Sequence, residues 1–237
     1  MKWRIIESNQ KSPQEIMDID TRLLEELTEN SQPILHLYEW NTPCLTHGYF
    51  TNPHKHLHKN KLEEHQLCIA RRPTGGGIIF HLSDFAFSIL IPSGHPNYST
   101  NTLENYKIIH QLIAIALSPL LPASKDIELL SHASACSTQE CASFCMSKPT
   151  QYDLIISGKK IGGAAQRKKK SGFLHQGSIS IAMPPLSILK DVLIEPSIVK
   201  AMQENSYSFL GLQWTQDELE NMRSEIKELL KNIINNI

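Results

Sequence analysis

The feature that most constrains the fold is the grouping of six short runs rich in β-forming residues. These runs are PILHLYEW (33–40), LCIARR (67–72), GIIFH (77–81), FAFSILIP (85–92), YDLIIS (152–157) and GFLHQGSISIAM (172–183). They arrive in groups, whereas a strictly parallel sheet needs a long crossover between successive strands. The sequence therefore predicts a largely antiparallel or mixed sheet, with hairpins at SGKK (157–160) and KKKSG (168–172).

Three amphipathic helices are predicted to flank this sheet, which makes the fold class α/β of the α+β type. They cover residues 12–27, residues from about 102 to Pro119, and residues from 215 toward the C-terminus. Capping boxes mark the starts of the first and third helices: Ser12 with Glu15, and Thr215 with Glu218. The predicted inner stripes are Ile16, Ile19, Leu23, Leu24 and Leu27; Tyr106, Ile109, Leu112, Ile113 and Leu117; and Leu219, Met222, Ile226, Leu229 and Ile233.

Composition and charge exclude several classes of protein. The chain has 237 residues, 41% of them hydrophobic, and no apolar run long enough to cross a bilayer. Its first residues, MKWRIIESNQ, are too charged for a signal peptide, so we expect a cytoplasmic protein. The net charge of −1 argues against nucleic-acid or membrane partners. The five cysteines are an odd number, which favours reduced thiols over disulfides.

The segment RRPTGGGIIFH (71–81) combines two arginines with three consecutive glycines. A single glycine there would indicate a hairpin turn with positive φ. Gly75, Gly76 and Gly77 directly after Arg71 and Arg72 instead favour a ligand loop, because free amides and guanidinium groups can bind an anion or a polarised carbonyl. The pattern matches neither a Walker loop nor a dinucleotide fingerprint.

Together with YDLIISGKKIGGAAQRKKKSGFLHQGSI, this segment resembles the paired signatures of the biotin and lipoate protein ligase superfamily, particularly lipoate–protein ligase A and the cysteine-dependent octanoyltransferases. WRIIESNQKSPQEIMDIDTRLLEEL and LYEWNTPCLTHGYF are also similar to that group. The resemblance implies one catalytic domain (1–237) with a curved mixed sheet flanked by helices. Its core would span about 1–185, with a helical extension at about 186–237 and no full accessory domain. The implied reaction joins octanoate or lipoate to one lysine of a small acyl-carrying domain.

The resemblance implies a role for Lys160 in catalysis. An ammonium group held near the reacting carbonyl would stabilise the negative charge of the transition state. The alternative is a solvated turn lysine, like its neighbour Lys159. His81 could line the acyl pocket or be a structural histidine, and the remaining histidines are expected on the surface. The implied substrate-binding residues are Arg71, Arg72, Thr74, Gly75, Gly76, Gly77, His81 and Gly163.

Two mechanisms remain open, and the sequence favours a transferase that uses Cys145 as nucleophile. Cys145 precedes YDLIISGKK, where the cysteine-dependent enzymes have their nucleophile, and the Arg-Asn-Asp of ligases is replaced by QYD (151–153). Gly77 points instead to a ligase, because a third glycine is typical of ligases. Gln176, in LHQG, takes the place of a second histidine that is common in both groups. Cys145 could also be a core residue or, with His132, Cys136 and Cys141, a zinc ligand, although the spacing does not favour a metal site.

Partners and cofactors follow from these alternatives. The acceptor would be a lipoyl domain of a 2-oxoacid dehydrogenase or the glycine cleavage H protein. The donor would be an octanoyl-acyl carrier protein for the transferase, or free lipoate with ATP and Mg for the ligase, and no tightly bound cofactor is expected. A noncatalytic member that only binds lipoyl domains is a third reading. Cys44 and Cys68 are expected in the core.

Overall fold

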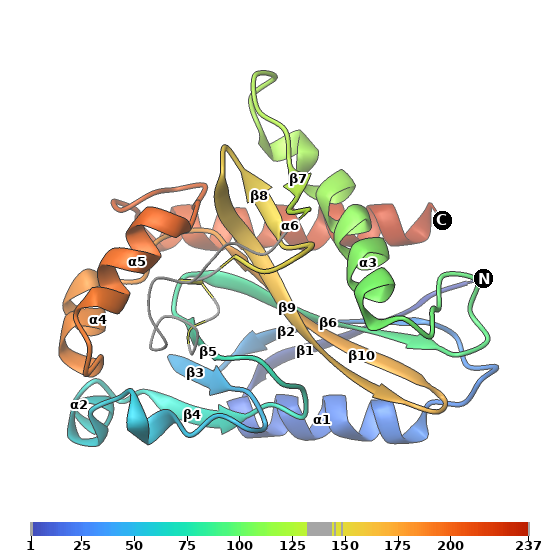
Figure 1. Cartoon of the computed structure of the whole chain (residues 1–237), viewed down its shortest axis with the longest axis horizontal. Helices are drawn as coiled ribbons and strands as arrows, with labels where there is room; N and C mark the ends of the chain where they lie inside the picture. The colour runs from blue at the N-terminus through green and yellow to red at the C-terminus, as the bar shows by residue number, and fades with distance from the viewer. Residues whose placement is uncertain (1, 132–143, 145, 148, 237) are drawn as a thin grey trace.

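The computed structural model describes residues 2–131, 144, 146, 147 and 149–236, which form two mixed sheets and their flanking helices (Figure 1). The larger sheet has the strand order β1 (Arg4–Lys11), β2 (Ile34–Trp40), β6 (Asp84–Pro92), β10 (Gly172–Ser180), β9 (Lys159–Lys169), β8 (Leu154–Ile156) and β7 (Glu128–Leu129). Only β1 and β2 are parallel among the described pairs of this sheet. The predicted mixed sheet and the hairpins at 157–160 and 168–172 are confirmed.

The smaller sheet has β3 (Cys44–His47) between β4 (Cys68–Arg71) and β5 (Ile78–His81). Strand β3 is parallel to β4 and antiparallel to β5. The glycine-containing segment joins β4 to β5, but these two strands do not pair with each other. A hairpin turn at the glycines is therefore wrong, because the segment must cross the end of β3 and so leaves its backbone outside the strand ladder.

Three of the helices are those predicted from the sequence. They are α1 (Pro13–Glu26), α3 (Thr102–Leu117) and α6 (Gln216–Asn235), and both predicted capping boxes are present. Figure 1 shows α3 and α6 on one side of the larger sheet and α1 on the other. Additional elements not predicted are η1 (Pro53–Lys55), α2 (Lys59–Glu64), η2 (Ser118–Leu120), α4 (Leu186–Val192) and α5 (Ser197–Asn205). No helix in the described ranges is long and apolar enough to span a membrane.

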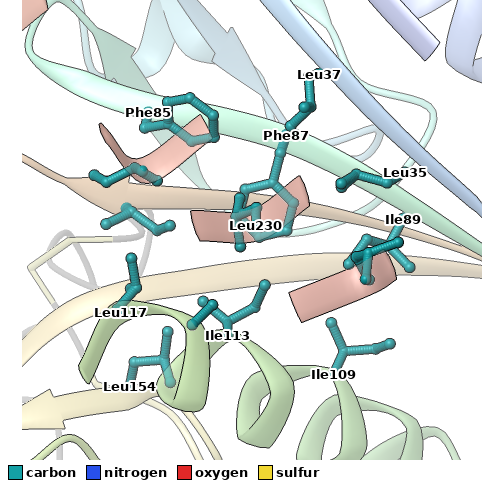
Figure 2. Packing of buried hydrophobic residues seen from close by; sticks show 14 of the residues in the cluster. Leu35, Leu37, Phe85, Phe87, Ile89, Ile109, Ile113, Leu117, Leu154 and Leu230 are labelled. Atoms are coloured by element: carbon teal, nitrogen blue, oxygen red, sulfur yellow. The ribbon is translucent and has the colours of Figure 1, made fainter. Parts of the chain in front are cut away.

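The apolar core under α3 and α6 is the largest hydrophobic cluster. Alternate residues of β6, among them Phe85, Phe87 and Ile89, pack there against Ile109 and Ile113 of α3 (Figure 2). Smaller clusters lie under α1 and between the smaller sheet and helices α2, α4 and α5. The larger sheet is thus covered on both faces, and several polar side chains are buried between the layers.

Several predicted positions are corrected by the structure. In α6 the buried residues are Leu230 and Ile234, not Leu229 and Ile233, because the stripe continues from Ile226 in steps of four. Cys44 is buried as predicted, but Cys68 is exposed because it begins the edge strand β4. The surface prediction for the remaining histidines is wrong for four that are buried: His36, His95, His110 and His175. In α3, Tyr106 and Leu112 are half-buried.

Candidate active site

Lys160 lies at the start of β9, immediately after a tight turn in which Ser157 and Gly158 both have positive φ. Its side chain is only 1% exposed, and its Nζ atom lies 2.7 Å from Oδ2 of Asp153. Lys159, by contrast, is exposed. Burying an ammonium group is costly unless it is paired, so this lysine is not a solvated turn residue. The structure holds it as one half of a buried ion pair.

Gly163 provides the room that the Lys160 side chain occupies. The register between β8 and β9 shifts by one residue between Leu154 and Ile155, so β9 contains a bulge just after Lys160. A Cβ atom at position 163 would lie 2.6 Å from Nζ of Lys160 and 3.0 Å from Oδ1 of Asp153. The missing side chain at Gly163 therefore serves the lysine itself in this structure, rather than leaving an open approach for a ligand.

Asp153 is a site residue that the sequence analysis did not identify. Its Oδ2 atom accepts hydrogen bonds from the backbone N (2.6 Å) and Oγ1 (2.8 Å) of Thr150, in addition to the contact with Lys160. The preceding residue, Tyr152, has a φ of 68°, which is strained for a bulky side chain. His110 of α3 donates from Nδ1 to the Tyr152 carbonyl at 2.5 Å and helps to hold that conformation. Nothing in the sequence spacing indicated this arrangement.

The glycine loop, defined as residues 72–77, is stabilised by hydrogen bonds from the side chain of Arg72. This side chain is 4% exposed, and its Nη2 atom donates to the carbonyls of Gly75 (3.1 Å) and Gly77 (2.7 Å). Its Nη1 atom donates to Oγ1 of Thr46 at 2.8 Å. Between the two carbonyls, Gly76 is exposed and has a φ of 83°, a conformation that L side chains rarely adopt. Arg72 therefore shapes the loop from within.

A chain of buried hydrogen bonds continues from Arg72 into the protein. Because Thr46 accepts from Arg72, its hydroxyl proton can be donated to Nε2 of His81 at 2.8 Å, and Nδ1 of His81 then donates to Asp84 at 2.7 Å. Ser178 donates to the same Asp84 oxygen at 2.6 Å. Burial alone would raise the pKa of the Asp84 carboxyl, but the interactions with His81 and Ser178 hold the pKa below its ordinary value. In this structure His81 connects a carboxylate to the loop.

A second buried chain reaches the loop through Thr74. Its Oγ1 atom donates to Oε1 of Gln176 at 2.7 Å, and Nε2 of Gln176 donates to Oδ2 of Asp20 at 2.6 Å. Asp20 is fully buried and also contacts Nδ1 of His36 (2.7 Å) and the hydroxyl of Ser88 (2.6 Å). Gln176 occupies the position where the resemblance led us to expect a second histidine, and its amide bridges a carboxylate and a hydroxyl here.

The turn at residues 48–51 is attached to the outer side of the glycine loop. The backbone N of Gly48 donates to the carbonyl of residue 77 at 3.3 Å, and that of Tyr49 donates to the carbonyl of residue 74 at 2.8 Å. The Thr51 hydroxyl donates to the carbonyl of residue 76 at 2.9 Å. A Cβ atom at Gly48 would lie 2.0 Å from the carbonyl oxygen of Gly76, so only glycine fits there. Arg71 points to this turn, with its guanidinium 4.6 Å from the centre of the Tyr49 ring. The two adjacent arginines thus have different surroundings.

The glycine loop and Lys160 share one face of β9. An added Cβ atom at Gly76 would contact Ala165 of β9 at 3.4 Å. Gly163, next to the Lys160 ammonium group, lies two residues earlier on the same face, a separation of about 7 Å along a strand. A polarised carbonyl or an anion between the loop and the lysine would therefore meet backbone amides on one side and a positive charge on the other.

A small cavity lies between β5, β10 and α5, and one of its lining residues, Ser206, pairs with Lys160. Its accessible volume is about 30 Å³, enough for one water molecule but not for an octanoyl chain. Phe144 and Met146 contribute to its wall. Cys145, the residue between them, lies outside the described residues, as do the other members of the possible zinc set: His132, Cys136 and Cys141.

Phe144 is connected to the strand that follows the glycine loop. Phe144 forms an isolated bridge with Ile78, the residue that directly follows the glycine loop. Ser206, which also lines the cavity, forms a bridge with Lys160. The chain neighbours of Cys145 therefore line the same cavity as Ile78, which follows the glycine loop, and Ser206, which pairs with Lys160.

A larger cavity of about 460 Å³ lies at the ends of β2 and β6, beside α6. Its two cations are already neutralised within the protein. Arg223 contacts Glu220 at 2.9 Å, and Lys227 contacts Glu7 at 2.7 Å. The lining of this larger cavity includes neither Phe144 and Met146, the chain neighbours of Cys145, nor Ser206, which pairs with Lys160, so we place the candidate chemistry at the smaller cavity despite its size.

Comparison with known proteins adds evidence independent of this geometry. Residues 12–228 match the family described as lipoyl protein ligase A/B catalytic domain. The chain is 32% identical to octanoyltransferase LipM of Halalkalibacterium halodurans over 75% of this chain and 65% of that protein. It is 30% identical to octanoyltransferase LipM of Bacillus subtilis over 86% of this chain and 74% of that protein. The chain thus spans slightly less than two thirds of the length of the first of these relatives.

Solved structures share the fold at lower sequence identity. Lipoate-protein ligase A bound with ATP superposes with a TM-score of 0.68 and 19% identity, covering 99% of this chain and 94% of that one. A bi-partite lipoate protein ligase from Thermoplasma acidophilum has the same TM-score and identity, covering 99% of this chain and 92% of that one. At this identity the likeness shows the fold alone.

Proposed function

Because the chain belongs to the lipoyl protein ligase A/B catalytic domain family, we propose that it transfers an octanoyl or lipoyl group to a lysine of a lipoyl domain. The observation that carries the proposal is the buried Lys160–Asp153 ion pair on the same face of β9 as the glycine loop. Attack on an acyl carbonyl builds negative charge on its oxygen, and a fixed ammonium group in a dry site stabilises that charge. A lysine used only for solubility would not be buried.

The leading mechanism is transfer through a thioester on Cys145. The Cys145 thiolate attacks the thioester of an octanoyl-carrier protein, the C–S bond to the carrier breaks and the carrier thiolate leaves, and the acyl group remains on the enzyme. The amine of the acceptor lysine then attacks, a C–N bond forms, and the C–S bond to Cys145 breaks, with the amine proton passing to the departing sulfur. The position of Phe144 and Met146 at the cavity beside Ser206 supports this assignment. So do the octanoyltransferase names of the relatives.

The glycine loop would bind the carbonyl end of the donor in this mechanism. Gly75 has open space around its missing side chain and Gly76 is exposed, so their backbone can approach a ligand closely. Arg72, His81 and Thr74 would act indirectly, by fixing the loop through their hydrogen bonds. No tightly bound cofactor is needed for this chemistry. We propose one catalytic domain over residues 1–237 that acts in the cytoplasm, where its protein partners would be found.

The alternative function is an ATP-dependent lipoate–protein ligase. Gly77 favours it, because the third glycine is typical of ligases, and the solved neighbours bear ligase names. With Mg present, the lipoate carboxylate would attack the α-phosphate of ATP, forming lipoyl-adenylate and releasing pyrophosphate, and the Lys160 ammonium group would face the phosphate and carbonyl of the adenylate. Cys145 would have only a packing role in that case.

Intact-mass measurements can separate these functions. The protein and an apo lipoyl domain would be incubated either with octanoyl-carrier protein or with lipoate, ATP and Mg. We expect octanoylation of the domain with the carrier protein, and an octanoyl adduct on the Cys145 peptide when the domain is withheld. Cys145→Ser should lose both, whereas Cys68→Ser, which alters an exposed thiol, should keep both. Normal lipoylation by Cys145→Ser with lipoate and ATP would instead identify a ligase.

A further inference from the structure

The turn at residues 48–51 displays two aromatic side chains to solvent. Phe50 is 91% exposed, the most exposed large hydrophobic residue in the described part of the chain, and Tyr49 is 45% exposed. Their rings contact each other edge to face at 5.1 Å between centroids. Exposed aromatic rings are enriched at protein interfaces, where they serve as anchors.

The position of this turn is fixed by its contacts with the glycine loop. Three hydrogen bonds attach it to the glycine loop, and Gly48 packs directly against the Gly76 carbonyl. Phe50 therefore stands on a turn that is fixed to the glycine loop before any partner arrives. A preformed anchor loses less conformational entropy on binding than a mobile one.

Two guanidinium groups flank the aromatic pair. Arg71 lies 4.6 Å and Arg167 6.0 Å from the centre of the Tyr49 ring. Neither arginine forms a salt bridge with a carboxylate among residues 2–131 and 149–236 or the three described residues between them. The Arg167 side chain donates from Nη1 to the carbonyl of Pro73, at 3.4 Å. Positive charge is thus available for an acidic partner at the rim of the glycine loop.

We propose that the docking surface for the acceptor lipoyl domain is formed by Tyr49, Phe50, Arg71 and Arg167. This inference rests on the proposed function. Phe50 inserts against an apolar part of the domain, and the two arginines meet acidic side chains close to the target lysine. It also gives Arg71 a role different from that of Arg72, which lies inside the loop.

The acceptor suits this surface better than the acyl donor does. The target lysine has only its own side chain with which to reach the acyl carbonyl, so the surface around it must contact the rim of the site. An acyl group on a carrier protein hangs from a flexible prosthetic arm, and free lipoate needs no docking surface. Both candidate mechanisms require the acceptor, so the inference does not depend on the donor.

The test compares Phe50→Ala and Arg167→Glu with matched controls. Ile115→Ala removes a side chain that is 62% exposed on α3, and Arg4→Glu reverses an exposed charge on β1. We expect each surface variant to weaken binding of the apo lipoyl domain by about tenfold in calorimetry and to raise its KM similarly. Acylation of the enzyme by the donor should be unchanged, and neither control should have an effect.

Charge reversal on the domain sharpens the result. In the lipoyl domain, an acidic residue beside the target lysine would be replaced by lysine. This altered domain should bind again to the Arg167→Glu enzyme but not to the Phe50→Ala enzyme. Unchanged domain binding by Phe50→Ala, which removes an exposed side chain and so leaves the fold intact, would overturn the proposal. Slower acylation by the carrier protein with normal domain binding would also overturn it, in favour of donor docking. If the natural chain transfers no acyl group, the proposed function fails, while calorimetry still tests the surface.

Discussion

The two faces of the larger sheet differ in kind, although the same strands build them. Phe87 of β6 lies opposite Gly177 of β10, and its ring packs under α3 and α6 (Figure 2). The next pair, Ser88 and Gln176, points to the other face, where both side chains donate to Asp20. One step along a strand therefore changes the environment from an apolar core to a buried polar network.

The difference shows how the fold separates stability from chemistry. On the apolar face, side chains fill space and hold two helices, and many shapes of similar volume would serve. On the polar face, Asp20 and Asp84 accept directional hydrogen bonds, and their partners lead from these two carboxylates to the glycine loop. Such a network specifies one arrangement, because an unpaired buried group is costly. The loop and Lys160 lie on that face.

The largest expected effect is on Lys160. Lys160→Met should lower turnover at least about a hundredfold with either donor, because the developing oxyanion loses its cation. It should also lower the free energy of unfolding by about 3–5 kcal/mol, because Asp153 is left as an unpaired buried charge. Turnover would be measured by mass spectrometry at saturating donor, and stability by urea denaturation.

A double variant separates the two consequences. Lys160→Met with Asp153→Asn removes both charges, so stability should recover in part while turnover remains low. Recovery of turnover together with stability would mean that Lys160 acts only through the fold.

A smaller effect on activity is expected from substitutions on opposite faces of β6 and β10. Phe87→Ala should lower the free energy of unfolding by about 3–5 kcal/mol through the cavity it leaves, with kcat/KM of the folded protein almost unchanged. Gln176→Ala should cost less stability, about 1–3 kcal/mol, yet should lower kcat/KM because Thr74 loses its tether. Normal kcat/KM in Gln176→Ala would remove this network from the function.

Much of the fold was readable from the sequence because its signals are local. The stripe of α1 follows helical spacing behind a capping box, and β6 is a continuous apolar run. Strand β9 was not among the six runs rich in β-forming residues, since KKIGGAAQRKK contains mainly lysine, glycine and alanine, and only the two flanking hairpin turns indicated it. It forms because β8 and β10 pair with its two edges. Short helices such as α4 and α5 are likewise stabilised by packing rather than by propensity.

The candidate site was readable only in part. The paired motifs indicated the family, which the family match confirms, and drew attention to Lys160 and the glycine loop. They could not indicate Asp153 as the partner of the lysine, or that Gly163 makes room for it, because both facts depend on a bulge and a strained turn. Arg71 and Arg72 look equivalent in sequence, but strand alternation directs one to solvent and the other inward.

The smallest expected effect tests the apolar face by pH. His110 and His175 are buried there with ring centroids 5.1 Å apart, and burial lowers the pKa of both, that of His175 well below its ordinary value. Folded imidazoles therefore resist protonation more than unfolded ones do. The stability they contribute should be complete above about pH 6.5 and should fall as pH decreases through that value toward the folded pKa.

The expected slope is up to about 1.4 kcal/mol per pH unit for each histidine. His175→Phe keeps an aromatic ring beside Phe87 and Tyr106 but cannot bind a proton, so its unfolding free energy should vary less between pH 6.5 and 5.5. Urea denaturation at pH 7.5, 6.5 and 5.5 provides the comparison. An unchanged slope would show that His175 is not the source of the acid sensitivity.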